Sequence, residues 1–210
     1  MSADDDWLAD TRNSYDTVAV SYAEWIRDSL AGAPDVLAAL AHFAGLVRAA
    51  GGGPVLDVGC GPGHVTAHLH ALGVDASGVD LSPGMVDVAR RDHPHLTFTV
   101  GSMTALDVAD SSVTGLLAFW SLVHVPDGAL PTVFAEFRRV LRPGGPLLVG
   151  FHVGTGSRLK TEGYGGHPMK VYVHRRRPDQ VADRLRGAGF TVTDERLPGV
   201  DEESGILFAR

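Results

Sequence analysis

Apolar positions recur along this chain at two different periods. Five apolar runs have the length of a buried strand, and they lie at residues 55–58, 76–80, 96–100, 113–120 and 146–152. After the first, second and fourth runs, apolar residues recur at helical spacing. Strands that alternate with helices are typical of parallel βαβ units, whose right-handed crossovers place helices on both faces of the sheet. The pattern therefore predicts a three-layer α/β fold, in which a doubly wound parallel sheet lies between two layers of helices.

The two ends of the chain depart from this alternation. Residues 1–50 have apolar positions at helical spacing, and we expect them to form an N-terminal helical cap over a core made by residues 51–210. Residues 154–169 are rich in glycine and have no period, so they are expected to form an irregular lid loop. Two strand-like pieces near the C-terminus, at residues 191–195 and 206–209, are expected to add an antiparallel edge to the sheet.

The overall composition indicates a globular protein of one domain. Its 210 residues suit a single α/β core, and no apolar run approaches the ~20 residues of a membrane span. The formal net charge of −7 disfavours a nucleic-acid partner, and the HRRR run at residues 174–177 is expected to be a solvated strand end. With no signal-peptide pattern and one cysteine, Cys60, we expect a protein of the bacterial cytoplasm. The oligomeric state is left open.

A glycine-rich segment follows the first predicted strand. Residues 55–69 read VLDVGCGPGHVTAHL, which has the spacing G-x-G-x-G rather than the G-x-G-x-x-G of dinucleotide sites, and it lacks the lysine of a phosphate-binding Walker loop. Asp57 would repel a pyrophosphate but suits a cationic amine. Asp80 ends the second strand, where a carboxylate accepts hydrogen bonds from a ribose diol. S-adenosylmethionine has both the ribose and the amine and lacks a pyrophosphate.

Three motifs in order carry a resemblance to a known family. VLDVGCGPGHVTAHL, then GVDLSPGMVDVAR, then LRPGGPLLV resemble the class I S-adenosylmethionine-dependent methyltransferases, and among them the small bacterial small-molecule methyltransferases, over about residues 15–210. The resemblance implies a Rossmann-like seven-stranded sheet with one antiparallel strand. It also implies S-adenosyl-L-methionine as the cofactor.

The resemblance further implies which residues hold the cofactor. The glycines would lie under its methionine part, Asp57 near its amino group, and Asp80 at both ribose hydroxyls. Many family members have an acid at the position of Ser102, and this chain departs there, so its hydroxyl or the Met103 backbone would accept from the adenine instead. The expected cofactor-binding residues are Tyr15, Tyr22, Asp57, Gly59, Gly61, Gly63, Asp80, Leu81, Met85, Ser102, Met103 and Phe119. For Tyr15 and Tyr22, packing against the domain is the alternative.

Methylation of a hydroxyl usually needs a general base, and histidines are the candidates. His124 and His152 follow the fourth and fifth predicted strands, at the functional edge of the sheet. Trp120, Tyr164 and His167 are the expected substrate-binding residues. No metal site is expected.

These features predict an enzyme that transfers a methyl group from S-adenosylmethionine to a small-molecule oxygen, nitrogen or sulfur nucleophile. Three alternatives remain open. They are a methyltransferase acting on a protein or on RNA, an NAD-dependent oxidoreductase, and a binding module that has kept the cofactor pocket without catalysis. The absent sixth-position glycine counts against the oxidoreductase.

Overall fold

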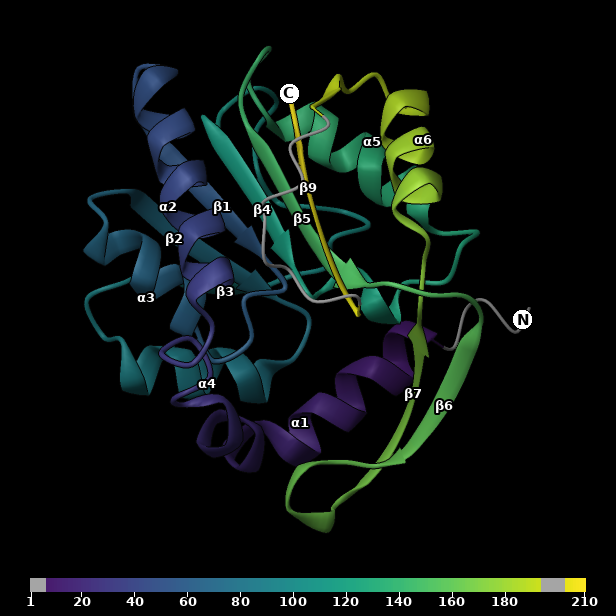
Figure 1. Cartoon of the computed structure of the whole chain (residues 1–210). Helices are drawn as coiled ribbons and strands as arrows, with labels where there is room; N and C mark the ends of the chain where they lie inside the picture. The colour runs from purple at the N-terminus through teal and green to yellow at the C-terminus, as the bar shows by residue number, and fades with distance from the viewer. Residues whose placement is uncertain (1–6, 194–202) are drawn as a thin grey trace.

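A seven-stranded sheet with helices on both faces organises the chain (Figure 1). The computed structural model describes residues 7–193 and 203–210. The elements in chain order are α1 (Trp7–Ile26), α2 (Pro34–Ala49), β1 (Pro54–Val58), α3 (His64–Ala71), β2 (Asp75–Asp80), α4 (Pro83–Asp92), β3 (Phe98–Val100), β4 (Gly115–Phe119), η1 (Leu122–His124), α5 (Leu130–Val140), β5 (Leu147–His152), β6 (Ser157–Glu162), η2 (Tyr164–Gly166), β7 (Pro168–His174), α6 (Pro178–Gly187), β8 (Val192–Thr193) and β9 (Ser204–Ala209).

The strand order confirms the predicted fold class. The sheet runs β3-β2-β1-β4-β5-β9-β8, and β9 is antiparallel to both of its neighbours while β1 to β5 pair in parallel. The expected C-terminal antiparallel addition is therefore present, with β9 inserted between β5 and β8. Residues 194 and 195, the end of the first predicted piece, lie outside the described residues.

The central strands are buried on both faces because successive side chains point to opposite sides of a strand. In β4, Leu116 and Ala118 pack with the apolar residues of α5 and α6, whereas Leu117 packs with those of α2 and α3. This arrangement explains why these strands read as continuous apolar runs. Among the described helices, none combines the length and the apolar character needed to cross a bilayer.

Helix α1 lies outside these layers, packed on α4 and beside β7 (Figure 1). Asp16 fixes it to the start of α4, because its Oδ1 accepts hydrogen bonds from the Ser82 hydroxyl at 2.6 Å and the Gly84 amide at 2.9 Å. On the other side, Val18 packs with Met169 and Val171 of β7. The helix is thereby held across the edge of the sheet where the parallel strands end.

Residues 154–169 do not form the irregular loop that the sequence predicts. They contain β6, η2 and the start of β7, and β6 and β7 pair as a separate antiparallel hairpin. The strand pattern was hidden because nearly every residue of β6 is exposed, so apolar and polar positions do not alternate there. The interpretation of residues 174–177 as a solvated strand end is wrong for Arg176, which is 5% exposed.

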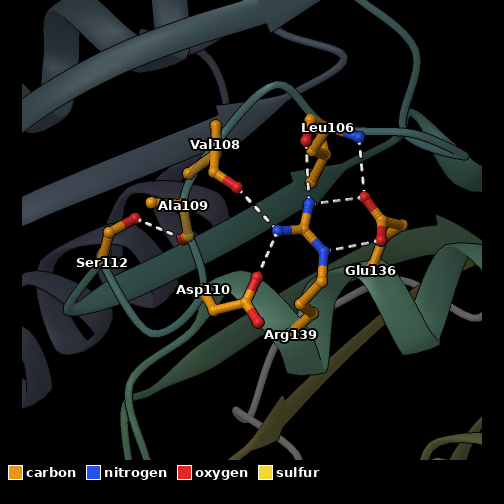
Figure 2. Close-up of polar contacts among 7 residues, drawn as sticks. All are labelled: Leu106, Val108, Ala109, Asp110, Ser112, Glu136 and Arg139. Carbon is orange, nitrogen blue, oxygen red and sulfur yellow. Dashed lines mark hydrogen bonds and ion pairs between the residues drawn. The ribbon is translucent and has the colours of Figure 1, made fainter.

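The segment between β3 and β4 is held in place by one arginine of α5. Figure 2 shows the Arg139 guanidinium among the groups that it contacts: it donates to the carbonyl oxygens of Leu106 and Val108 at 2.8 and 2.7 Å and pairs with the carboxylates of Glu136 and Asp110. These partners hold the pKa of Arg139 above its usual value. The network fixes the segment that begins just after β3.

Candidate active site

A cavity lies at the carboxyl ends of β1, β2 and β4, beneath α1. In a doubly wound sheet this is the edge at which ligands bind, at the point where the strand order reverses. Here the order reverses between β1 and β4, which are neighbours in the sheet. We refer to the space lined by the glycine loop, Asp57, Asp80 and the first half of α1 as the first cavity.

The glycine loop is held open by backbone contacts to β2. The amides of Gly59 and Cys60 donate to the Val79 carbonyl, at 2.7 and 3.1 Å, and the Gly61 amide donates to Asp80 Oδ2 at 2.8 Å. Gly59 and Gly61 have φ angles of 75° and 55°, which favour glycine, and both line the first cavity. Gly63 does not line either cavity, although it was expected among the cofactor residues.

Gly63 has a packing role instead. It is the N-cap of α3 with a φ of 83°, and a Cβ there would lie 2.7 Å from the ring of Phe98. The close approach of α3 to the β3 side of the sheet therefore requires glycine at this position.

Two carboxylates dominate the electrostatics of the first cavity. Asp57 is 1% exposed and accepts a hydrogen bond from the Thr66 hydroxyl at 2.7 Å, yet burial raises its pKa to about 7. Asp80 accepts from the amides of Gly61 and Ser82, and burial also raises its pKa. No lysine or arginine of the described residues lines this space. The cavity is therefore acidic and lacks a protein counter-charge.

Most of the predicted cofactor residues line the first cavity. They are Tyr15, Tyr22, Asp57, Gly59, Gly61, Asp80, Leu81, Met85, Ser102, Met103 and Phe119. The Ser102 hydroxyl is hydrogen bonded to that of Thr104 at 2.7 Å. Trp7, Leu8 and Thr11 of α1 also line the space and were missed. Their helical pattern predicted a helix but gave no sign of which face would cover a ligand.

A second cavity of about 930 Å³ adjoins the first. The two share residues from α1, α3, the end of β4 and η1, which are Tyr15, Tyr22, His64, Val65, Phe119, Trp120 and His124. Trp120 has a φ of 52°, a left-handed conformation that is strained for a side chain of this size and that is found mostly at functional sites. The volume lies within the ~300–1,000 Å³ typical of small-molecule sites.

Four of the five predicted substrate and base residues line this second cavity, namely Trp120, His124, His152 and Tyr164. His167 does not. It is exposed at the outer end of the β6–β7 hairpin, where its carbonyl accepts from the Gly163 amide, so its imidazole is outside both cavities. The hairpin turn, which the sequence pattern did not reveal, is what places His167 there.

His124 lies at the junction of the two cavities and has a defined tautomer. Its Nδ1 is 2.8 Å from the Tyr172 carbonyl, which can only accept, so Nδ1 carries the proton and donates. Nε2 then accepts from the Tyr15 hydroxyl at 2.7 Å. Burial lowers the pKa of His124 to about 4, so the ring is neutral at physiological pH and Nε2 is its acceptor atom.

Three further residues of the site were missed by the sequence analysis. Arg176 donates to the Leu122 and Val125 carbonyls and pairs with Asp127, which ties the hairpin to the segment carrying His124. The Ser121 hydroxyl and His64 Nδ1 are buried without a hydrogen-bond partner in the described part of the chain. Buried polar atoms are normally paired, so these two are available to a ligand or to an ordered water. His64 lies within the glycine-rich motif at residues 55–69, but nothing in that motif assigns a role to its side chain, and Ser121 belongs to no motif.

The sequence and the fold are similar to those of known methyltransferases. Residues 55–145 match the family described as "Methyltransferase domain". The chain is 33% identical over 123 residues to a malonyl-acyl-carrier-protein O-methyltransferase of Serratia marcescens, covering 56% of this chain and 48% of that protein. It is 29% identical over 188 residues to a demethylmenaquinone methyltransferase of Symbiobacterium thermophilum, covering 70% and 71%. The chain therefore spans less than half the length of the Serratia relative.

The fold similarity extends over the whole chain. The structure of a 1,6-didemethyltoxoflavin-N1-methyltransferase of Burkholderia thailandensis, with 1,6-didemethyltoxoflavin and S-adenosylhomocysteine bound, matches with a TM-score of 0.70 at 26% identity. The match covers 100% of this chain and 91% of that one. The N-terminal helices and the hairpin thus lie within the matched region.

Proposed function

We propose that this chain is a class I S-adenosylmethionine-dependent methyltransferase, which binds S-adenosylmethionine in the first cavity and transfers its methyl group to a small molecule in the second. One observation carries the cofactor assignment: two carboxylates, the buried Asp57 and the partly buried Asp80, face this space, and no described lysine or arginine lines it. Such a site favours a cationic ligand and disfavours the pyrophosphate of NAD. The Burkholderia structure, which holds S-adenosylhomocysteine, supports the same assignment.

The two carboxylates would bind different parts of the cofactor. Asp80 uses two acceptor sites on the Gly61 and Ser82 amides, and a carboxylate has about four, so two remain for a ribose diol. Asp57 lies deeper and would interact with the cationic amino-acid part. The glycine loop lets the backbone come close to the ligand without a Cβ in the way.

When bound, S-adenosylmethionine supplies a methyl carbon that is already electrophilic. The protein then has to align the acceptor with that carbon and exclude water. The aromatic side chains shared by the two cavities are placed to do so, since Tyr15, Tyr22, Phe119 and Trp120 lie at the junction. His124 is placed to take a proton there, through Tyr15 or directly after the Tyr15 ring moves aside.

The acceptor class and the cellular location are parts of the same proposal. A small-molecule acceptor is supported by the Burkholderia structure, which holds 1,6-didemethyltoxoflavin, and by the size of the second cavity. The net charge of −7 argues against RNA as the acceptor. We place the enzyme in the bacterial cytoplasm, in agreement with the bacterial origin of these relatives.

The direct test is calorimetric titration with S-adenosylmethionine, S-adenosylhomocysteine and NADH. Binding of the first two with micromolar affinity, together with methyl transfer to at least one member of a pool of phenols, amines and thiols, is the expected result. Binding of NADH alone would replace the proposal with the oxidoreductase alternative. Cofactor binding without any transfer would favour a non-catalytic module.

The affinity for S-adenosylhomocysteine is expected to rise with pH up to about 7. Free Asp57 has a pKa near 7 and is protonated below it, whereas the ligand ammonium favours the ionised carboxylate, so binding releases a proton. The dissociation constant should then fall by up to about tenfold per pH unit below pH 7 and level off above it. Calorimetry in buffers of different ionisation enthalpy measures the released proton. In Asp57→Asn, both the proton release and the pH dependence should vanish.

His124→Gln is expected to lower kcat for a hydroxyl acceptor by about 10²–10⁴-fold, because a general base contributes about that factor. Affinity for S-adenosylhomocysteine should change little, since the imidazole bonds within the protein to Tyr15 and Tyr172. His152→Gln is the matched control, because His152 lines the second cavity only and should have the smaller effect. With a His124 pKa near 4, the rate should not fall between pH 8 and pH 6 from protonation of this residue. Equal losses in the two variants would contradict the assignment.

A further inference from the structure

We infer that the methyl acceptor is a planar anion, a small molecule with an apolar or aromatic body and a carboxylate or similar acidic group, bound in the second cavity. This inference rests on the proposed function and adds the chemical class of the acceptor. Cationic, aromatic and aliphatic side chains all line this cavity, and the candidate base lies at the junction with the first cavity.

The charge of the second cavity is opposite to that of the first and to that of the protein. Arg158, Lys160 and Arg175 line it, and no aspartate or glutamate of the described residues does. The chain as a whole carries a formal charge of −7. Three cations gathered in one concave site of an acidic protein focus a positive potential there, which attracts an anionic ligand.

The cations come from the hairpin, and the strand geometry explains how they converge. Arg158 and Lys160 are two residues apart in β6, so their side chains share a face of the hairpin. Val173, which is paired with Arg158, also lines the cavity. Arg175 follows at the end of β7.

These three cations differ in their protein partners. Arg175 lies 3.7 Å from the Glu203 carboxylate and donates to the Val153 carbonyl, so part of its charge is already compensated. Arg158 and Lys160 have no acidic partner in the described part of the chain. Lys160 instead lies over the Tyr164 ring, with Nζ 3.9 Å from the ring centroid, and burial lowers its pKa. Arg158 and Lys160 are therefore the groups left to pair with an acid on the ligand.

The aromatic and aliphatic lining of the same cavity suits a flat apolar body. Phe119 and Trp120 pack edge to face at a centroid distance of 4.3 Å, and with Ile26, Leu30 and Val36 they supply the apolar lining. Trp25 also lines the cavity and is 68% exposed, which is unusual for so large an apolar side chain. An aromatic ligand would cover part of this surface and stack on it.

The arrangement also fixes how the ligand would lie. His124 is shared with the first cavity, whereas Arg158 and Lys160 line the second cavity alone. An acceptor whose acidic group pairs with these cations would have its nucleophile at the junction, where the methyl group is transferred.

The test compares two probes of the same shape, 6-hydroxy-2-naphthoate and the uncharged 6-hydroxy-2-naphthamide. Calorimetric titrations are made with the free protein and with protein saturated with S-adenosylhomocysteine. The naphthoate is expected to bind about tenfold more tightly than the amide, and the difference should shrink as salt is raised. The double variant Arg158→Gln, Lys160→Gln should bind the naphthoate no more tightly than the amide while its affinity for the amide is unchanged.

Arg91→Gln is the matched control. It removes the same kind of charge from an exposed position on α4, where Arg91 pairs with Asp92, and should leave both affinities unchanged. Equal affinity of the two probes, no binding of either, or an equal loss in Arg91→Gln would overturn the inference. Binding of S-adenosylhomocysteine in the same instrument reports on the proposed function separately. Unchanged amide affinity shows that the double variant is folded at the site.

Discussion

Asp80→Ala is expected to weaken the binding of S-adenosylhomocysteine by about 10²–10⁴-fold. Two hydrogen bonds to the ionised carboxylate are lost, each contributing about 1.5–3 kcal/mol, and a loss of about 3–6 kcal/mol corresponds to this factor at about 1.4 kcal/mol per tenfold. The Gly61 and Ser82 amides, which Asp80 accepts from, lose their partner as well. Calorimetry measures the change. Asp87→Ala, which removes an exposed carboxylate from α4, is the control and should bind normally.

The loss in Asp80→Ala has two possible origins, and a change in the ligand separates them. Adenosine and 2′,3′-dideoxyadenosine differ only in the diol. If the carboxylate binds the hydroxyls, the natural protein should bind adenosine more tightly than 2′,3′-dideoxyadenosine, and Asp80→Ala should bind the two with equal affinity. If the variant still prefers adenosine by the same factor, Asp80 acts only through the loop, and our placement of the ribose is wrong.

The glycines of the loop are expected to respond differently to the same substitution. A Cβ on Gly59 would lie 2.2 Å from Cβ of Ser121, and the φ of 75° is unfavourable for alanine. Overpacking and left-handed strain together should lower the free energy of unfolding by about 2–5 kcal/mol. Urea unfolding measures this loss, which is a large part of the ~5–15 kcal/mol stability of an ordinary domain.

Gly61→Ala is the matched comparison. Its φ is 55°, and the nearest atom to an added Cβ is Tyr22 Cε1 at 3.8 Å, so only the left-handed strain of about 1–2 kcal/mol is expected. The added methyl group would occupy space in the first cavity, which Gly61 lines, and should weaken S-adenosylhomocysteine binding. Equal destabilisation in the two variants would contradict this division between packing and binding.

The local pattern of the sequence was sufficient to predict the strands of the sheet and the carboxylates and glycines that line the acidic first cavity. Buried parallel strands have continuous apolar runs in the sequence, and each strand is followed along the chain by the loop at its own carboxyl end. Asp57 and Asp80 lie at the carboxyl ends of the adjacent strands β1 and β2, and Gly59 and Gly61 lie in the loop after β1, so their convergence follows from the order of strands and helices. The antiparallel strand β9 was predicted in the same way, from its apolar run.

Only the tertiary structure shows which side chains lie across the site from these loops. Tyr15 meets His124 across 109 positions of the chain, and Arg176 is buried against a segment more than fifty residues earlier. The hairpin was hidden because β6 is solvated on nearly all of its residues, and that same solvation leaves Arg158 and Lys160 available to line a cavity. The period of apolar residues indicates which side of a helix or strand is buried. The contacts described here depend instead on where α1 and the hairpin pack. Packing between distant segments produces no period in the sequence.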